Sequence, residues 1–188
     1  MVDPISCAVF LLAAFTLAGA AHTAWLTTAA SKGFAQPLDA GLTFRGRRLL
    51  GANKTVKGFV VMVPAAAVSF VALAAATPAS AGLWSLSLGG YAALGALAGF
   101  GFMAGELPNS FVKRQLDIPP GMSATTPLAA ALQFSLDRLD SGLGMLAVIS
   151  AVVPTPWTTW ATVLLAGPAI HWTFSVVMFR LGLKARPA

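Results

Sequence analysis

The chain has 188 residues, of which 57% are hydrophobic and only 10% are charged, and its formal net charge is +6. A soluble domain carries about 25% charged residues, so this composition excludes an ordinary soluble globular protein. Together with a mean hydropathy of +0.78, it predicts an integral membrane protein.

Five uncharged stretches are predicted to cross the membrane as helices. They cover residues 5–26, 59–77, 83–105, 141–153 and 157–179 of a single domain, 1–188. A spanning helix needs about 20 apolar residues, and only the fourth stretch is clearly short. No basic residues precede the first stretch, which is therefore interpreted as a retained helix rather than a signal peptide. The expected fold class is an all-α polytopic membrane protein with five transmembrane helices.

The twelve Lys and Arg residues predict how these helices are oriented. All of them fall in the predicted loops 27–58 and 106–140 or in the tail after residue 179, and none falls in the other two loops. Because cytoplasmic loops carry an excess of basic residues, we expect the N-terminus outside the cell membrane. The C-terminus and both basic loops are then cytoplasmic, and these loops hold the polar residues available for chemistry.

The first basic loop mixes glycines with cations ahead of the second predicted span. Glycine lets the backbone approach a ligand closely, and Lys and Arg attract phosphate. A P-loop needs Gly-x4-Gly-Lys-Ser/Thr after a strand, but two residues separate Gly51 from Lys54 and no strand is expected before them. We therefore reject that fold and retain anion binding ahead of the helix. A basic segment that only sets topology and touches anionic lipids remains equally open on charge alone.

Three carboxylates belong to the second basic loop. Asp137 and Asp140 are three residues apart on a helix expected over 127–153, so they share a face. Only a short apolar run follows them, which places them at the membrane boundary, where ionisable groups are costly and suggest function. Without nearby His or Cys they suit Mg²⁺, or Mn²⁺, and Glu106 is a third candidate ligand. A local pair between Arg138 and one carboxylate, acting as an interfacial anchor, stays open.

The run GELPNSFVKRQ follows the third predicted span directly and starts at Gly105. Pro108 predicts the start of a new helix, because proline favours the first helical position. Asn109 and Lys113 then share one face of that helix. A helix break with cations that reach toward the interface is the alternative.

Three other residues of chemical interest lie inside predicted spans. Cys7 is the only cysteine, which excludes an internal disulfide and a thiolate metal cluster. His22 and His171 lie in separate spans without a partner in sequence. We expect each of them to be a packed, hydrogen-bonded histidine rather than a ligand.

Taken together, the two basic loops resemble the signature motifs of CDP-archaeol synthases, integral membrane enzymes related to the CDP-diacylglycerol synthases. The first motif is LDAGLTFRGRRLLGANKTVKGF, and the second is GELPNSFVKRQLDIPPG followed by LDRLDSGLG. The family usually has Asp at the position of Glu106, and Trp-Arg at the positions of Val56 and Lys57. The resemblance implies transfer of CMP from CTP to a lipid phosphate monoester among membrane lipids, with release of pyrophosphate and no nucleic-acid partner.

The resemblance also implies roles for individual residues. Asp137 and Asp140, with Glu106, are expected to bind the metal. Lys113 and Arg114 are expected to act with the two aspartates in catalysis, steadying the lipid phosphate or the leaving pyrophosphate. The expected substrate contacts are Arg45, Arg47, Arg48, Asn53, Lys54, Thr55, Lys57, Asn109 and Ser110.

Other activities remain open from the sequence. A CDP-diacylglycerol synthase acting on phosphatidic acid would use the same motifs, since tail recognition depends on the shape of an apolar groove. A small ion-binding transporter or a membrane scaffold belongs to a different class. Transporter sites lie near mid-membrane, often between repeated halves, whereas this chain has no internal repeat and gathers its polar residues on one side.

Overall fold

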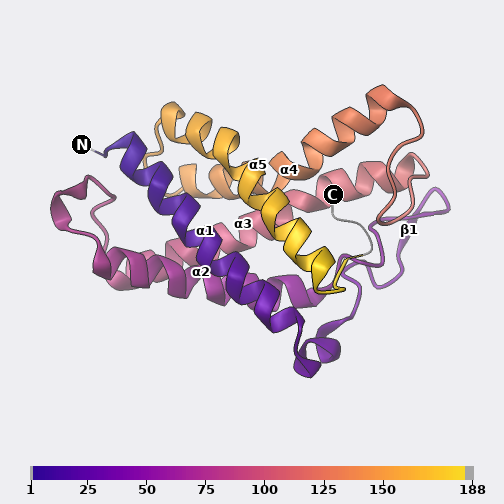
Figure 1. Ribbon diagram of the computed structural model, residues 1–188, viewed down its shortest axis with the longest axis horizontal. Helices are drawn as coiled ribbons and strands as arrows, with labels where there is room; N and C mark the ends of the chain where they lie inside the picture. The colour runs from indigo at the N-terminus through magenta and orange to yellow at the C-terminus, as the bar shows by residue number, and fades with distance from the viewer. Residues whose placement is uncertain (1, 185–188) are drawn as a thin grey trace.

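The computed structural model describes residues 2–184, in which five long α-helices are joined by irregular segments (Figure 1). Met1 and residues 185–188, including the tail cation Arg186, lie outside the described residues. The long helices are α1 (Pro4–Leu26), α2 (Val56–Ala76), α3 (Leu88–Gln115), α4 (Pro127–Ser150) and α5 (Trp157–Arg180). The short elements are η1 (Ala29–Phe34), β1 (Thr43–Phe44), β2 (Arg47–Arg48) and η2 (Ala79–Ala81).

Four of the long helices, α1, α2, α3 and α5, are long and apolar enough to cross a membrane. They confirm a mostly helical, multi-pass membrane protein. The helix expected over 127–153 is also present as α4, but α4 is not among the four. Its first half carries Asp137, Arg138 and Asp140, and only its second half is apolar. The fifth span and the orientation of the termini therefore stay predictions.

The prediction that a new helix starts at Pro108 is wrong. Helix α3 begins at Leu88, later than expected, and continues without a break through Pro108 to Gln115. Proline removes one backbone hydrogen bond, but packed helices in membrane proteins tolerate that loss because neighbouring groups satisfy the freed carbonyl. The predicted loop 106–140 is therefore mostly helix, and the irregular segment is only 116–126.

The prediction that no strand precedes Gly51 is also wrong. Strands β1 and β2 pair as a two-residue antiparallel hairpin, with Thr43 opposite Arg48. The two residues of its turn, Arg45 and Gly46, both have positive φ angles, 52° and 76°, as a type I′ turn requires. A hairpin this short is not the buried strand of a P-loop, so the rejection of that fold is unaffected.

The helices alternate in direction, so the long loops collect at one end of the molecule (Figure 1). The segments 27–55 and 116–126 lie there, and 77–87 and 151–156 lie at the other end. That other end is closed by an aromatic cluster in which Phe10 packs edge-on against Phe70, with ring centroids 5.1 Å apart. Next to it, the Tyr91 hydroxyl donates a 2.6 Å hydrogen bond to the carbonyl oxygen of Trp84. The end with the aromatic cluster and the end with the long loops, called the polar end below, thus lie at opposite ends of the helices.

Helix α3 lies between α2 and α4 and approaches both closely through glycines. Gly95 and Gly99 face α2, where a Cβ at Gly95 would lie only 2.7 Å from a carbonyl oxygen. Gly101 and Gly105 face α4, where a Cβ at Gly105 would lie 2.9 Å from the Cα of Gly144. Small residues spaced four apart let membrane helices pack backbone to backbone. This contact holds the polar end of α3 against the carboxylates of α4.

Candidate active site

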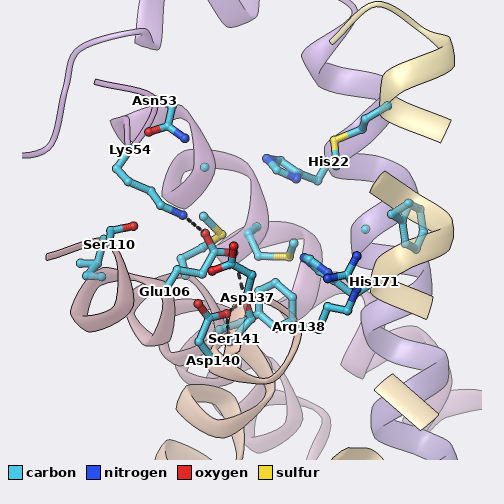
Figure 2. A pocket seen from close by; sticks show the side chains of 18 of the residues that line it. His22, Asn53, Lys54, Glu106, Ser110, Asp137, Arg138, Asp140, Ser141 and His171 are labelled. Atoms are coloured by element: carbon cyan, nitrogen blue, oxygen red, sulfur yellow. Dashed lines mark hydrogen bonds and ion pairs between the residues drawn. The ribbon is translucent and has the colours of Figure 1, made fainter. Parts of the chain in front are cut away.

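A cavity of about 860 Å³ opens at the polar end, lined by all five long helices and both polar loops (Figure 2). Ten of the residues predicted to form the site line it. They are Asn53, Lys54, Thr55, Lys57, Glu106, Ser110, Lys113, Arg114, Asp137 and Asp140. Apolar side chains such as Phe15, Phe102 and Phe174 line it as well. The cavity therefore combines a charged wall with an apolar one.

Lys54 and Glu106 form an ion pair that joins the first loop to α3. The two side chains are only 21% and 20% exposed, and the Ser141 hydroxyl donates a 2.9 Å hydrogen bond to the same carboxylate. Burial disfavours the charged ammonium, but the charge and hydrogen bond of Glu106, with Asp140 and Asp137, raise the pKa of Lys54 above its usual value. Lys54 is thus a fixed cation inside the cavity.

Asp137 and Asp140 face α3 from α4, as their spacing predicted. Asn109 donates to both of them through Nδ2, at 2.6 Å to Asp137 and 2.8 Å to Asp140. Lys113, one turn further along α3, donates to Asp137 at 2.6 Å. The shared face of Asn109 and Lys113 is therefore confirmed, although the helix that carries them is not a new one. Asn109 therefore orients the two aspartates but does not itself line the cavity.

Lys54 and Thr55 are the last residues of the first loop and lie directly before α2. Backbone hydrogen bonds fasten this point: Leu38 donates to the carbonyl of Lys54 at 2.9 Å, and Val56 donates to that of Gln36 at 3.0 Å. Thr55 is the N-cap of α2, yet its side chain makes no capping hydrogen bond. The Thr55 hydroxyl thus remains available beside Lys54, at the position where the sequence predicted anion binding.

Three predicted contacts, Arg45, Arg47 and Arg48, do not line the cavity. Arg48 forms an ion pair with Asp39, whose side chain is 1% exposed. Arg47 pairs with Asp117 at 2.5 Å, and the Arg45 guanidinium lies over the Phe44 ring at 5.2 Å. All three therefore support the hairpin and its contact with the end of α3.

Asp39 is the acceptor that holds this loop together. Its carboxylate accepts the Arg48 guanidinium and the backbone amides of Gly41 and Leu50, at 3.1 and 3.0 Å. Burial alone would raise its pKa, but these donors and the Arg48 charge hold the pKa of Asp39 below its usual value. Asp39 is therefore a structural carboxylate.

The carboxylates fit a hard cation in part. Oxygen ligands suit Mg²⁺, which keeps several waters when bound, and Asp137 and Asp140 offer such oxygens side by side. Glu106 is directed instead at Lys54 and Ser141. Across residues 2–184, no group of three or more His, Cys, Asp and Glu side chains is arranged to hold a metal ion. The fit is thus to a pair of aspartates with water completing the shell.

The structure adds residues that the sequence analysis did not place in the site. His22, His171, Arg138 and Ser141 all line the cavity. The expectation that His171 is hydrogen-bonded is wrong among the described residues, because its buried Nδ1 has no partner there. Both histidines lie in the half of their helix nearest the basic loops, and this position in the sequence could have indicated that they belong to the site.

Arg138 does not form the local pair with a carboxylate, the alternative that the sequence left open, in the described part of the chain. Its Nη1 instead donates to the carbonyl oxygen of Phe134 at 2.7 Å, and its guanidinium lies 3.2 Å from the centre of the Phe134 ring. Asp137 is already engaged by Asn109 and Lys113. The cation of Arg138 is therefore not neutralised by the neighbouring aspartates.

Comparison with known proteins identifies related sequences over most of the chain. A family model described as CarS-like CDP-archaeol synthase matches residues 8–187. A CDP-archaeol synthase of Halobacterium salinarum is 34% identical over 164 residues, covering 82% of this chain and 84% of that protein. One from Aeropyrum pernix is 37% identical over 156 residues, covering 81% and 78%.

A solved structure agrees with the sequence comparison. It is that of an intramembrane enzyme for archaeal membrane lipid biosynthesis, and it superposes with a TM-score of 0.63 at 27% identity. The match covers 92% of this chain and 94% of that one. The similarity therefore extends over the whole helical arrangement and not only over the two motifs.

Proposed function

The chain belongs to the CDP-archaeol synthase family, and from this premise we propose that its cavity is where CMP is transferred from CTP to an archaeol-type lipid phosphate. One observation carries the proposal. Lys54, Lys113 and the three carboxylates converge on a cavity whose other wall is apolar. Such a cavity suits a triphosphate and a lipid at the same time.

The reaction needs no covalent intermediate on the protein. An oxygen of the lipid phosphate attacks the α-phosphorus of CTP and forms the new P–O bond. The bond between the α-phosphorus and the bridging oxygen breaks, and pyrophosphate leaves with the electron pair. Transfers of this kind depend on positioning and on stabilising negative charge. The residues of the cavity are therefore expected to bind and orient rather than to react.

The start of α2 is the proposed CTP phosphate site. Lys54, Thr55 and Lys57 lie at or near the N-terminus of this helix, where the helix dipole favours an anion. The Lys54 ammonium has three donors, so it can keep Glu106 and still bind a phosphate oxygen. Arg114 reaches the same place, because a Cβ at Gly51 would lie 3.0 Å from its Nη1.

The carboxylate pair is the proposed metal site. Asp137 and Asp140 would hold Mg²⁺, which supplies positive charge to the triphosphate when bound. Asn109 fixes the orientation of both aspartates, and Lys113 places a second cation beside Asp137 for the departing pyrophosphate. Ser110 lines the same part of the cavity and is buried. We place this end at the cytoplasmic face, where CTP is available and where the basic loops are expected.

The test is CDP-lipid formation by the purified protein with CTP, Mg²⁺ and a panel of lipids. The panel contains an archaeol-type phosphate, phosphatidic acid and the archaeol-type alcohol without phosphate. The Asp137→Ala, Asp140→Ala double variant is expected to lose at least about a hundredfold in rate, because removing charge stabilisation at one site has effects of that order. Asp117→Ala, which removes a carboxylate outside the cavity, is the control. Wild-type rates in the double variant would contradict the assignment.

A further inference from the structure

Buried polar atoms without a hydrogen-bond partner gather around the cavity. Within residues 2–184, four buried side-chain polar atoms have no partner: Arg114 Nε, Arg138 Nε, Thr158 Oγ1 and His171 Nδ1. The two arginines and the histidine line the cavity. Buried polar atoms are almost always hydrogen-bonded, so three orphan atoms at one cavity indicate that a bound group completes them.

Two of these residues lie away from the start of α2. Arg138 comes from α4 and His171 from α5, and Figure 2 shows them together on the side of the cavity opposite Lys54. Arg114 instead lies beside Gly51 and belongs to the CTP side.

Neither Arg138 nor Lys184 forms an ion pair within the described residues. Arg138 is in no ion pair in the described part of the chain and stacks on Phe134 instead. Lys184 follows α5, lines the same cavity and donates to the Ser175 hydroxyl at 3.1 Å. Burial lowers the pKa of Lys184, and the cations Lys54 and Arg138 lower it further, although Glu106 and Asp137 oppose this. An anion bound among these groups would relieve that repulsion.

The surroundings of this side are apolar. Along α5, Phe174 and Met178 line the cavity near His171, and Phe15 of α1 faces the same space. Hydrocarbon tails attached to a phosphate would bury their surface against these side chains. A lipid phosphate needs cations for its phosphate and an apolar surface for its tails, and this side of the cavity offers both.

We propose that Arg138 and His171, with Lys184 at the edge, bind the phosphate monoester of the lipid substrate. This inference rests on the proposed function, because it assigns the second substrate to the wall opposite the CTP phosphates. A phosphate has three acceptor oxygens, and the Arg138 fork and the His171 ring nitrogen offer donors to them. The attacking oxygen then enters from α4 and α5, while the α-phosphorus is held from α2 and α3.

The test separates the two substrates by kinetics. Arg138→Met and His171→Ala are expected to raise KM for the lipid phosphate about tenfold or more, since a lost hydrogen bond to a charged group has an effect of that size. KM for CTP is expected to change less than about twofold. His171→Gln, which keeps a donor, should recover part of the loss. Arg180→Ala removes a cation from the end of α5 outside the cavity lining and is the matched control.

The outcomes distinguish this inference from the proposed function. No CDP-lipid from the wild-type protein with any lipid phosphate would overturn both. An active wild-type protein together with an unchanged KM for lipid phosphate in Arg138→Met and His171→Ala would overturn the inference alone, and so would an equal rise in KM for CTP. CTP binding measured by calorimetry serves as the folding check. If Arg138→Met no longer binds CTP, Arg138→Lys takes its place, and its KM for the lipid phosphate is compared in the same way.

Discussion

The Lys54–Glu106 ion pair allows a quantitative test of how the first loop is attached to the helices. Lys54→Met leaves the Glu106 carboxylate with only the Ser141 hydrogen bond in a site where both charged side chains are about 80% covered. Removing one partner of a buried pair costs about 3–5 kcal/mol, and partial exposure favours the lower end, about 3 kcal/mol. Glu106→Gln should cost about 1–2 kcal/mol, because Asp137 and Asp140 still attract the Lys54 charge.

The double variant is the decisive measurement. With both charges gone, no unpaired ion remains, so the combined loss should be smaller than the sum of the single losses by about 1–3 kcal/mol. The assay is the apparent free energy of unfolding in mixed micelles, measured for the wild-type protein, both single variants and the double variant.

The same set of single and double variants at a second ion pair is the control. Arg47 and Asp117 also form an ion pair, but their side chains are 46% and 65% exposed, so their coupling should stay below about 1 kcal/mol. Additive losses at Lys54 and Glu106, with a coupling no larger than that of the control pair, would refute the conclusion that this pair is a buried structural link.

Four further outcomes are expected. Gly144→Leu should abolish turnover and lower the melting temperature, because a Cβ there would lie 2.6 Å from the Cα of Gly105. Gly89→Ala on α3 is the control: it lies outside the cavity lining, its Cβ would meet only the Ser87 Oγ at 3.8 Å, and it should leave both unchanged. Arg48→Met should destabilise the protein by about 3 kcal/mol without raising KM for CTP, since it strands a buried carboxylate outside the cavity. Folding lowers the pKa of Asp39, so its contribution to stability is present above about pH 4 and is lost as the pH falls through the pKa of the folded protein. The melting temperature of Asp39→Asn should therefore fall less steeply than that of the wild-type protein below about pH 4. Chelation by EDTA should stop CDP-lipid formation and added Mg²⁺ should restore it, whereas unchanged activity in EDTA would contradict the proposed metal site.

The local consequences of the sequence were predicted well where one short segment decides them. The spacing of Asp137 and Asp140 predicted a common helical face, and the apolar runs predicted α1, α2 and α5 close to their observed bounds. The third run predicted a helix, but α3 starts and ends later than expected. The position of Lys54 and Thr55 just before a helix followed in the same way. Each of these depends on neighbours within about one or two helical turns, which the order of residues specifies.

Contacts between distant segments were not predictable in the same way. The pairing of Arg48 with Asp39, rather than with an anion in the cavity, depends on a hairpin whose two-residue strands carry almost no pattern. The run through Pro108 contradicts the local preference of proline and is tolerated because α3 is packed on both sides.

The sequence by itself determined that this is a membrane protein with its chemistry collected in two basic loops, because composition and charge distribution act without reference to tertiary contacts. The two motifs also determined the family. Only the tertiary structure decided that Glu106 meets Lys54 and Ser141, and that Arg138 Nε and His171 Nδ1 lie at one cavity without a hydrogen-bond partner among residues 2–184. The physical reason is that glycine contacts set how closely α3 and α4 approach, and that approach fixes which polar groups meet and which are left for a substrate.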